Sequence, residues 1–232
     1  EDCVLIDMLM CDQASNTIRR KPLSELQVLV PTNIVQADME SAVADNFAAS
    51  LARLEQAGVP ITTCVLPALD EALALTPKYG TITAPEAWVI HHELLESERA
   101  DEVDPRVASR IFAGRDMPAA HYIELLQAQA RLIANVSEYV GDALIAMPTT
   151  VHTAPLRQPL EDDDEAYYRI NLLTLRNTML GNFLDTPGLA LPNGFDEKGL
   201  PTSILFSAAS GRDENLLSYG LTLESVVGVS TD

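Results

Sequence analysis

Metal binding is the first chemistry that the histidines and acidic residues of this chain suggest. His91 and His92 are adjacent, and Glu86, Glu93 and Glu96 lie close to them in the sequence. Adjacent residues point in different directions on a helix, and the His-Glu-x-x-His spacing that places two imidazoles on one helix face is absent. We therefore interpret the two histidines as part of a helix surface and expect no metal ligands in this chain.

Nucleophilic catalysis by serine is the second chemistry to consider. Hydrolysis of an unactivated amide needs a nucleophile, a proton shuttle and hydrogen-bond donors for the developing oxyanion. The chain has no Gly-x-Ser-x-Gly elbow, no Gly-Gly-Ser-Ser segment and no glycine-rich phosphate loop. Each serine lacks a local activating context, although the partners of a triad can come from distant segments. We assign no catalytic residue to these 232 residues.

A third candidate is the acidic run Glu161–Glu165, which follows Pro155 and Pro159. Five consecutive acidic side chains repel one another, and prolines disfavour regular structure before them. We predict a solvated loop here rather than a cation site.

The elements that would position any site begin with a strand, a helix and a second strand. Residues 26–30 are apolar apart from Gln27 and are followed by Pro31. Apolar residues then recur at helical spacing at Met39, Val43, Phe47, Leu51 and Leu54. Gly58 is a natural helix end, and residues 59–66 are rich in β-branched side chains. The order predicts two parallel strands joined by a helical crossover.

The rest of the chain continues this alternation. Residues 69–108 have a helical pattern interrupted by Pro77, Pro85 and Pro105, and residues 121–140 give the clearest amphipathic helix. The apolar run 143–147 predicts a buried strand. Residues 189–191 and 203–206 predict a hairpin with a longer loop, and a final helix begins at Asp213. The first ten residues also have a helical pattern, typical of a chain cut inside a larger protein.

Composition limits the classes of partner. The chain carries 15 basic and 34 acidic residues, a formal net charge of −19, so we expect neither nucleic acid nor an anionic membrane as partner. Its three cysteines follow no disulfide or zinc spacing, which favours a reducing, cytoplasmic compartment. No apolar run has the roughly 20 residues that a membrane-spanning helix needs.

Several motifs together resemble the C-terminal part of amidase signature hydrolases. The strongest runs from Asn177-Thr178-Met179-Leu180-Gly181-Asn182 through Leu189-Ala190-Leu191-Pro192-Asn193-Gly194 to Gly199-Leu200-Pro201. Weaker likeness extends over Glu1-Asp2-Cys3-Val4-Leu5, Ala84-Pro85-Glu86-Ala87, Asp142 to Thr150 and Thr153-Ala154-Pro155. The order and spacing of these segments carry the resemblance, since no single tripeptide is diagnostic.

The resemblance implies an α/β fold with a mixed β-sheet flanked by helices. It also implies hydrolysis of a carboxamide by a serine activated through a second serine and a lysine. None of these catalytic groups can be assigned here, so they are expected upstream of Glu1, and the isolated chain is expected to be inactive. No cofactor is implied.

In such relatives the C-terminal half forms the wall of the substrate pocket. Asn171 stands where glutamine-handling relatives carry an acidic residue, which favours a neutral or acidic amide over an ammonium-bearing one. Arg110 lies near a segment that supplies a carboxylate-binding arginine in some relatives, and Thr150 and Thr174 are further candidates. The alternatives are that Asn171 caps or packs and that Arg110 forms a surface salt bridge.

We accordingly expect residues 1–232 to form a single unit, the C-terminal part of an amidase domain acting on a small-molecule amide. The rival hypothesis is a non-catalytic binding or scaffold module. A partial sheet exposes a strand edge and an apolar face, so either hypothesis allows a homodimer or a complementary N-terminal chain as partner.

Overall fold

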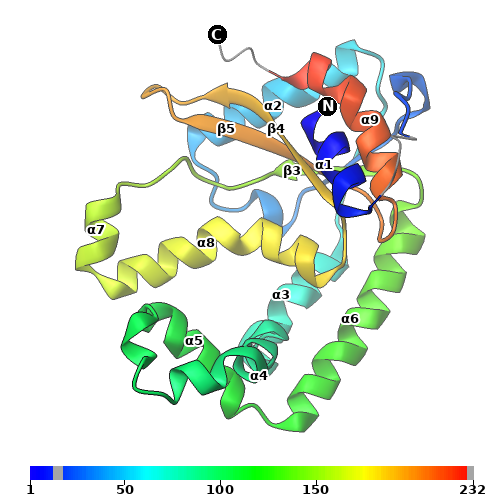
Figure 1. Ribbon diagram of the computed structural model, residues 1–232. Coiled ribbons are helices and arrows are strands. Elements are labelled where there is room, and N and C mark those ends of the chain that lie inside the picture. The colour runs from blue at the N-terminus through cyan, green and yellow to red at the C-terminus, as the bar shows by residue number, and fades with distance from the viewer. Residues whose placement is uncertain (13–17, 229–232) are drawn as a thin grey trace.

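A five-stranded mixed β-sheet with helices on both faces organises the protein (Figure 1). The computed structural model describes residues 1–12 and 18–228. The strands, in the spatial order β2-β1-β3-β5-β4, are β1 Val28–Pro31, β2 Ile61–Cys64, β3 Leu144–Pro148, β4 Gly188–Phe195 and β5 Pro201–Ser207. The α-helices are α1 Asp2–Met10, α2 Ser41–Gln56, α3 Pro67–Tyr79, α4 Thr83–Leu95, α5 Pro105–Arg115, α6 Ala119–Val140, α7 Arg157–Asp162, α8 Asp164–Phe183 and α9 Asp213–Val227. This architecture confirms the predicted fold class.

The parallel half of the sheet is the unit predicted from the first strand-helix-strand pattern. β1 pairs in parallel with β2, from Val28 opposite Ile61 to Pro31 opposite Cys64, and α2 connects the two strands. β3 is parallel to β1 on its other side. The prediction of two parallel strands is confirmed, with β2 shorter than expected because its last apolar residues lead into α3.

The antiparallel half is the predicted hairpin. β5 pairs antiparallel with both β3 and β4. The hairpin turn contains Gly199, whose φ of +80° lies in the region that favours glycine. Asp196 closes this turn by accepting hydrogen bonds from the main-chain N–H groups of Lys198 and Leu200, each at 2.8 Å.

Successive side chains of the central strands point to opposite faces of the sheet, so the interior consists of two hydrophobic cores. Val28, Val30, Leu144, Ala146 and Phe206 face α2 and α9. The intervening residues of the same strands, including Leu29, Ile145, Met147 and Leu205, face α3, α6 and α8. Both faces of these strands are therefore buried, as expected for a sheet covered by helices on both sides.

Two local predictions need correction. The acidic run 161–165 is not a loop, because Asp163 caps α8 by accepting hydrogen bonds from the N–H groups of Glu165 and Ala166, and Asp164 and Glu165 form its first turn. Negative side chains stabilise a helix N-terminus, so clustered acidic residues can begin a helix. Pro77 lies inside α3 near its end and does not interrupt it.

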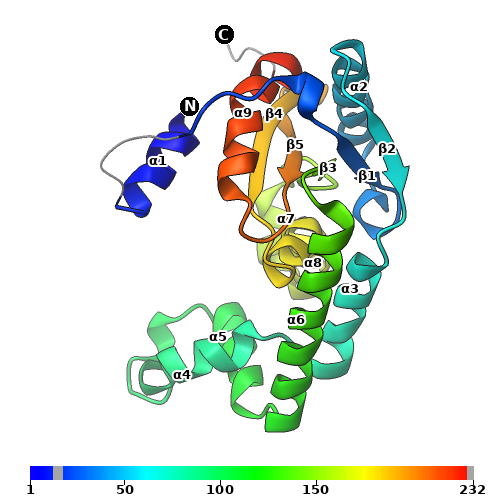
Figure 2. The same cartoon turned by 90° about the vertical axis from the view of Figure 1, so that its right-hand side faces the viewer.

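The α4–α5 pair projects away from the sheet (Figure 2). These two helices pack closely on each other: a Cβ atom on Gly114 would lie 2.1 Å from the carbonyl oxygen of Ala84. Such backbone proximity requires glycine at this position of α5.

Helix α1 has the predicted helical pattern, but most of its apolar side chains face solvent. Val4 is buried, whereas Leu5, Leu9 and Met10 are 53%, 66% and 82% exposed. A groove between α1, β4 and α9 is lined by residues that include Val4, Leu191 and Leu217. This face of the molecule thus carries apolar surface without a covering element in the described part of the chain.

Candidate functional site

The candidate site lies where the parallel strands β1 and β3 end. Because the two strands are parallel, their carboxyl ends, Pro31 and Pro148, lie at the same edge of the sheet. In open α/β sheets this edge is the usual place for a ligand. The segment after β3 and helix α8, which runs beside the sheet in Figure 1, supply the polar side chains there.

Asn177 fixes α8 to both strand ends. The residue is 1% exposed, and its Nδ2 donates to the carbonyl oxygens of Val35 at 3.0 Å and Pro148 at 2.8 Å. The sequence motif that begins at Asn177 therefore has a structural basis: one buried amide joins the segment after β1, the end of β3 and α8.

Arg176 adds a second anchor on the same turn of α8. Its guanidinium donates to the carbonyl oxygen of Ala37 at 2.6 Å and pairs with Asp38 at 3.2 Å. The arginine side chain is only 8% exposed, so the ion pair and the carbonyl bond compensate for the burial of its charge. Together, Arg176 and Asn177 determine where the C-terminal half of α8 lies.

Thr150 and Thr174, predicted from the sequence as pocket residues, meet around His152. Thr174 Oγ1 lies 2.9 Å from His152 Nε2, and Thr150 Oγ1 donates to the main-chain oxygen of His152 at 2.9 Å. The imidazole is buried, with 8% of the residue exposed, and its Nδ1 lies 2.7 Å from the carbonyl oxygen of Thr153. The structure thus brings two of the four predicted residues together.

Asn171 lies one turn before Thr174 on the same face of α8 and is half-buried. Arg110 lies on α5, where its exposed side chain donates to the main-chain oxygen of Arg106 at 3.1 Å. Neither side chain is among the partners of His152. Asn171 and Arg110 belong to separate helices, so their relative position depends on the contacts between α5 and α8.

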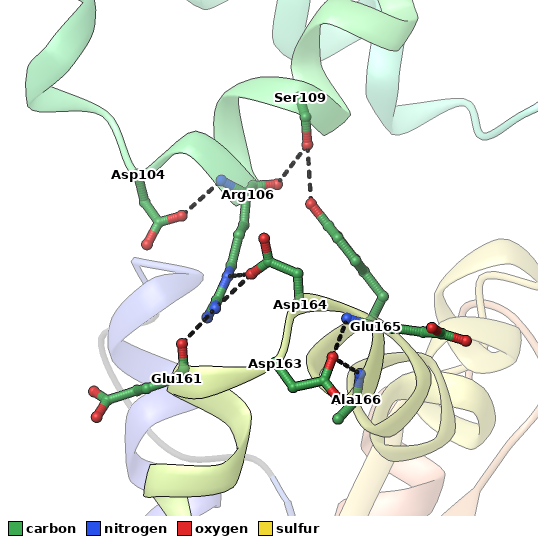
Figure 3. Close-up of polar contacts among 9 residues, drawn as sticks. Asp104, Arg106, Ser109, Glu161, Asp163, Asp164, Glu165 and Ala166 are labelled. Carbon is green, nitrogen blue, oxygen red and sulfur yellow. Dashed lines mark hydrogen bonds and ion pairs between the residues drawn. The ribbon is translucent and has the colours of Figure 1, made fainter.

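A polar contact region joins α5 to α7 and α8 (Figure 3). Arg106 pairs with Asp164 at 2.6 Å and donates to the carbonyl oxygen of Glu161 at 3.3 Å. Its guanidinium also lies over the Tyr167 ring, 4.3 Å from the centroid. One turn later, the Ser109 hydroxyl lies 3.4 Å from the Tyr168 hydroxyl. These contacts hold the segment that contains Arg110 beside the first turns of α8.

The hydroxyl–imidazole pair of Thr174 and His152 resembles part of a catalytic triad, but its surroundings lack the other requirements. Thr174 lies in the interior of α8, where the neighbouring N–H groups are used by helical hydrogen bonds and none is free to stabilise an oxyanion. Nδ1 of the imidazole faces a main-chain carbonyl rather than a carboxylate. The pair is therefore suited to orienting a hydroxyl and does not constitute a complete nucleophilic centre.

A second polar cluster extends from the same loop. The Thr153 hydroxyl lies 3.2 Å from a carboxylate oxygen of Glu40 and 3.2 Å from one of Asp196, so its one proton is shared between them or given to either. The cluster is at the edge of a cavity of about 670 Å³ between α2 and the hairpin turn. The pKa of Asp196 is lowered by hydrogen bonds from the N–H groups of Leu200 and Lys198 and from Thr153. The carboxylate is consequently held in its charged form as part of the turn.

Sequence reasoning missed His152, Glu40 and Asp196 as members of this region. His152 lies between two segments already noted for their family likeness, the one that ends at Thr150 and the one that begins at Thr153. Its significance comes from Thr174, which is 22 residues away in sequence, so no local spacing could reveal the pair.

Residues 1–12 and 18–228 contain no group of three or more His, Cys, Asp or Glu side chains arranged to hold a metal ion. His92 instead places its Nδ1 3.2 Å from the carbonyl oxygen of Trp88 on its own helix. Within those same residues, no helix is both long enough and apolar enough to span a membrane.

Comparison with known proteins extends this picture. The chain is 24% identical over 203 residues to a 2-amino-5-chloromuconic acid deaminase from Comamonas testosteroni, covering 88% of this chain and 44% of the relative. It is 28% identical over 231 residues to a glutamyl-tRNA(Gln) amidotransferase subunit from Pseudomonas aeruginosa, covering 89% of this chain and 46% of that relative. The chain thus spans about half the length of the curated relatives that it matches.

Solved structures share the fold. A crystal structure described as an amidase superposes with a TM-score of 0.76 at 20% identity, covering 98% of this chain and 51% of that one. An allophanate hydrolase from Kluyveromyces lactis gives a TM-score of 0.74, also at 20% identity, covering 90% of this chain and 33% of that one. The model of the Amidase family matches residues 8–217, which is most of the chain. The protein therefore belongs to the Amidase family.

Proposed function

We propose that residues 1–232 form one structural unit, the C-terminal part of an amidase that hydrolyses a carboxamide to a carboxylate and ammonia or an amine. The family match over residues 8–217 carries this proposal. The polar cluster at the end of β3 supports it further, because that edge is where a ligand would be expected.

In this proposal the bond-breaking groups lie in sequence that precedes Glu1. They are a nucleophilic serine, a second serine that relays its proton, and a lysine that accepts it. A buried lysine with a depressed pKa can be neutral and act as a base, and main-chain N–H groups of a glycine-rich loop would receive the oxyanion. The present chain contributes the wall of the substrate pocket through Thr150, Asn171 and Thr174.

The substrate in this proposal is a small amide that is neutral or acidic. Asn171 offers an uncharged amide where an acidic side chain would pair with an ammonium group, and Arg110 supplies a cation from α5. The deaminase relative acts, by its name, on an acid that carries an amino group, which agrees with an acidic substrate. We propose a cytoplasmic setting because the cysteines are free and two of them are exposed.

The test is ammonia release from simple aliphatic and aryl carboxamides. Two proteins are compared: the chain of 232 residues alone, and the same chain joined to the polypeptide that its gene encodes before Glu1. We expect turnover only from the joined protein, and its loss when the serines of a Gly-Gly-Ser-Ser segment are replaced by alanine. Turnover by the chain alone would refute the assignment of catalysis to the preceding sequence.

A second candidate function is a non-catalytic module that binds a partner chain. The exposed apolar side chains of α1 and the adjoining groove beside β4 favour it, since such surfaces are commonly covered in an assembly. The partner would be a second copy or a complementary N-terminal chain. Light scattering at low protein concentration tests this: a stable monomer would count against it, as would catalytic serines in the preceding sequence.

A further inference from the structure

Helices α4 and α5, with the segment between them, form an arm over residues 83–115 that is packed within itself. The Trp88 ring lies 5.6 Å from the Phe112 ring, centroid to centroid, and the guanidinium of Arg115 lies 5.3 Å from the Phe112 centroid. Of the described residues that make up the two hydrophobic cores of the sheet, none lies in this arm. The arm is thus a separate packing unit, in agreement with its projection away from the sheet in Figure 2.

The arm is joined to the rest of the molecule by two short connections that lie side by side. Residues 80–82 lead from α3 to α4 and residues 116–118 lead from α5 to α6, and neither connection is helix or strand. Gly80 has a φ of +90°, which favours glycine, and a Cβ atom there would lie 2.8 Å from Met117 Cε. Two adjacent connections define one axis about which the arm can rotate as a rigid body.

The opposite end of the arm is held by polar contacts. Arg106 lies about 14 Å along the axis of α5 from the connection at residues 116–118. It pairs with Asp164 at 2.6 Å and donates to the carbonyl oxygen of Glu161 at 3.3 Å (Figure 3). The Asp164 side chain is 70% exposed, so water and salt weaken this ion pair. Such a contact breaks and forms again more readily than a buried apolar interface.

The start of the arm forms one wall of the cavity of about 350 Å³. Thr83 and Glu86 of α4 line it together with Leu125 of α6 and Met179 of α8. Leu125 is only 1% exposed, and the Tyr122 hydroxyl, one turn earlier on α6, donates to Glu86 at 3.2 Å. Rotation of the arm would therefore move one wall of the cavity and uncover Leu125.

We propose that the arm is a lid over this cavity, which rotates about the connections at Gly80 and Met117, is latched by the ion pair of Arg106 with Asp164, and admits small molecules when it opens. Arg110 lies on the same helix as the latch and moves with the lid. This candidate substrate-binding cation is accordingly presented only in one position of the arm. The proposal concerns movement and access, and it does not depend on the reaction proposed above.

Thiol alkylation measures how often the lid opens. The test uses the 232-residue chain with Cys3, Cys11 and Cys64 replaced by serine, in which Leu125→Cys reports the lid and Leu132→Cys reports unfolding. Leu132 is also on α6 and 1% exposed, but it belongs to the core beside the sheet. Iodoacetamide is the reagent, because it is uncharged and salt then acts only on the protein. We expect alkylation to be about 10-fold or more faster for Leu125→Cys than for Leu132→Cys.

Loss of the latch should raise the population of the open form. Asp164→Asn is expected to speed alkylation of Leu125→Cys by about 2- to 5-fold and to leave Leu132→Cys unchanged. High salt should speed the reaction of Leu125→Cys with the latch intact more than in Asp164→Asn. The matched control is Glu102→Gln, which removes an ion pair with Arg99 at 2.7 Å that lies within the arm, and it should change neither rate.

Three outcomes would overturn the lid: equal alkylation rates at the two positions, an equal acceleration of both by Asp164→Asn, or an effect of Glu102→Gln as large as that of Asp164→Asn. Met179→Cys, on the α8 wall of the cavity, repeats the measurement at a half-buried position that tolerates a smaller side chain. Its alkylation should respond to Asp164→Asn in the same direction, and the absence of a response there would also contradict the proposal.

Discussion

Replacement of Asn177 by leucine tests how the site is attached to the sheet. Leucine has a similar volume, so the change removes the hydrogen bonds of the amide while leaving little cavity. Asn177 donates to two carbonyl oxygens, and both its own amide and its surroundings are buried. Each acceptor that loses its donor in a buried place costs about 1–3 kcal/mol. Because relaxation offsets part of this loss, we expect a decrease of about 2–4 kcal/mol in the free energy of unfolding.

Urea denaturation followed by circular dichroism measures this change, with the slope of the transition expected to stay constant. Thr178→Ala, one position further along α8, is the control, since its hydroxyl makes only a local bond to Leu175. That variant should change the free energy by no more than about 0.5 kcal/mol. A loss below about 0.5 kcal/mol for Asn177→Leu would show that this amide does not hold α8 to the strand ends.

Three further predictions concern the surroundings of the site. A Cβ atom on Gly194 would lie 2.3 Å from Asn46 Cγ. Gly194→Ala should therefore lower the free energy of unfolding by about 1–3 kcal/mol in urea titrations. An unchanged free energy would show that Asn46 does not crowd this position. Asp196 has a folded-state pKa below its unfolded value, so its contribution to stability is present above about pH 4 and is lost as the pH falls through the folded-state pKa. Asp196→Asn should therefore reduce the loss of unfolding free energy between about pH 4 and lower pH in urea titrations. An unchanged pH dependence in this range would refute the contribution. Asp164→Asn removes the ion pair with Arg106 and should speed amide hydrogen exchange in α5 more than in α6. The difference in exchange rate between this variant and the unchanged chain should be smaller at high salt, which screens the ion pair. Equal effects on both helices would show that this contact does not hold α5.

The sequence was sufficient to predict the elements that have strong local signals. The apolar runs that end at Pro31 and Pro148 are strands, and the helix over residues 121–140 begins only two residues earlier than predicted. These predictions succeed because periodicity and proline are local properties of the chain. The prediction of a loop at residues 161–165 was wrong, because the same acidic composition suits a solvated loop and a charged helix start.

The candidate site was predictable only in part, because its partners come from distant segments. Thr150 and Thr174 were selected through family likeness, and the structure shows that both contact His152. The role of Asn177 as a buried link between α8 and two strands depends on tertiary contacts that no spacing reveals. Asn171 and Arg110 remain predictions as substrate-binding residues.

The central claim is that the segment after β3 and the adjoining face of α8 form the wall of an amide-binding site. Chemical-shift mapping of the ¹⁵N-labelled chain during titration with a simple carboxamide tests it most directly. We expect saturable shifts concentrated in residues 150–153 and 171–174. Shifts concentrated instead around the separate cavity of about 350 Å³ between α3, α6 and α8, or no saturable shifts at all, would contradict the claim.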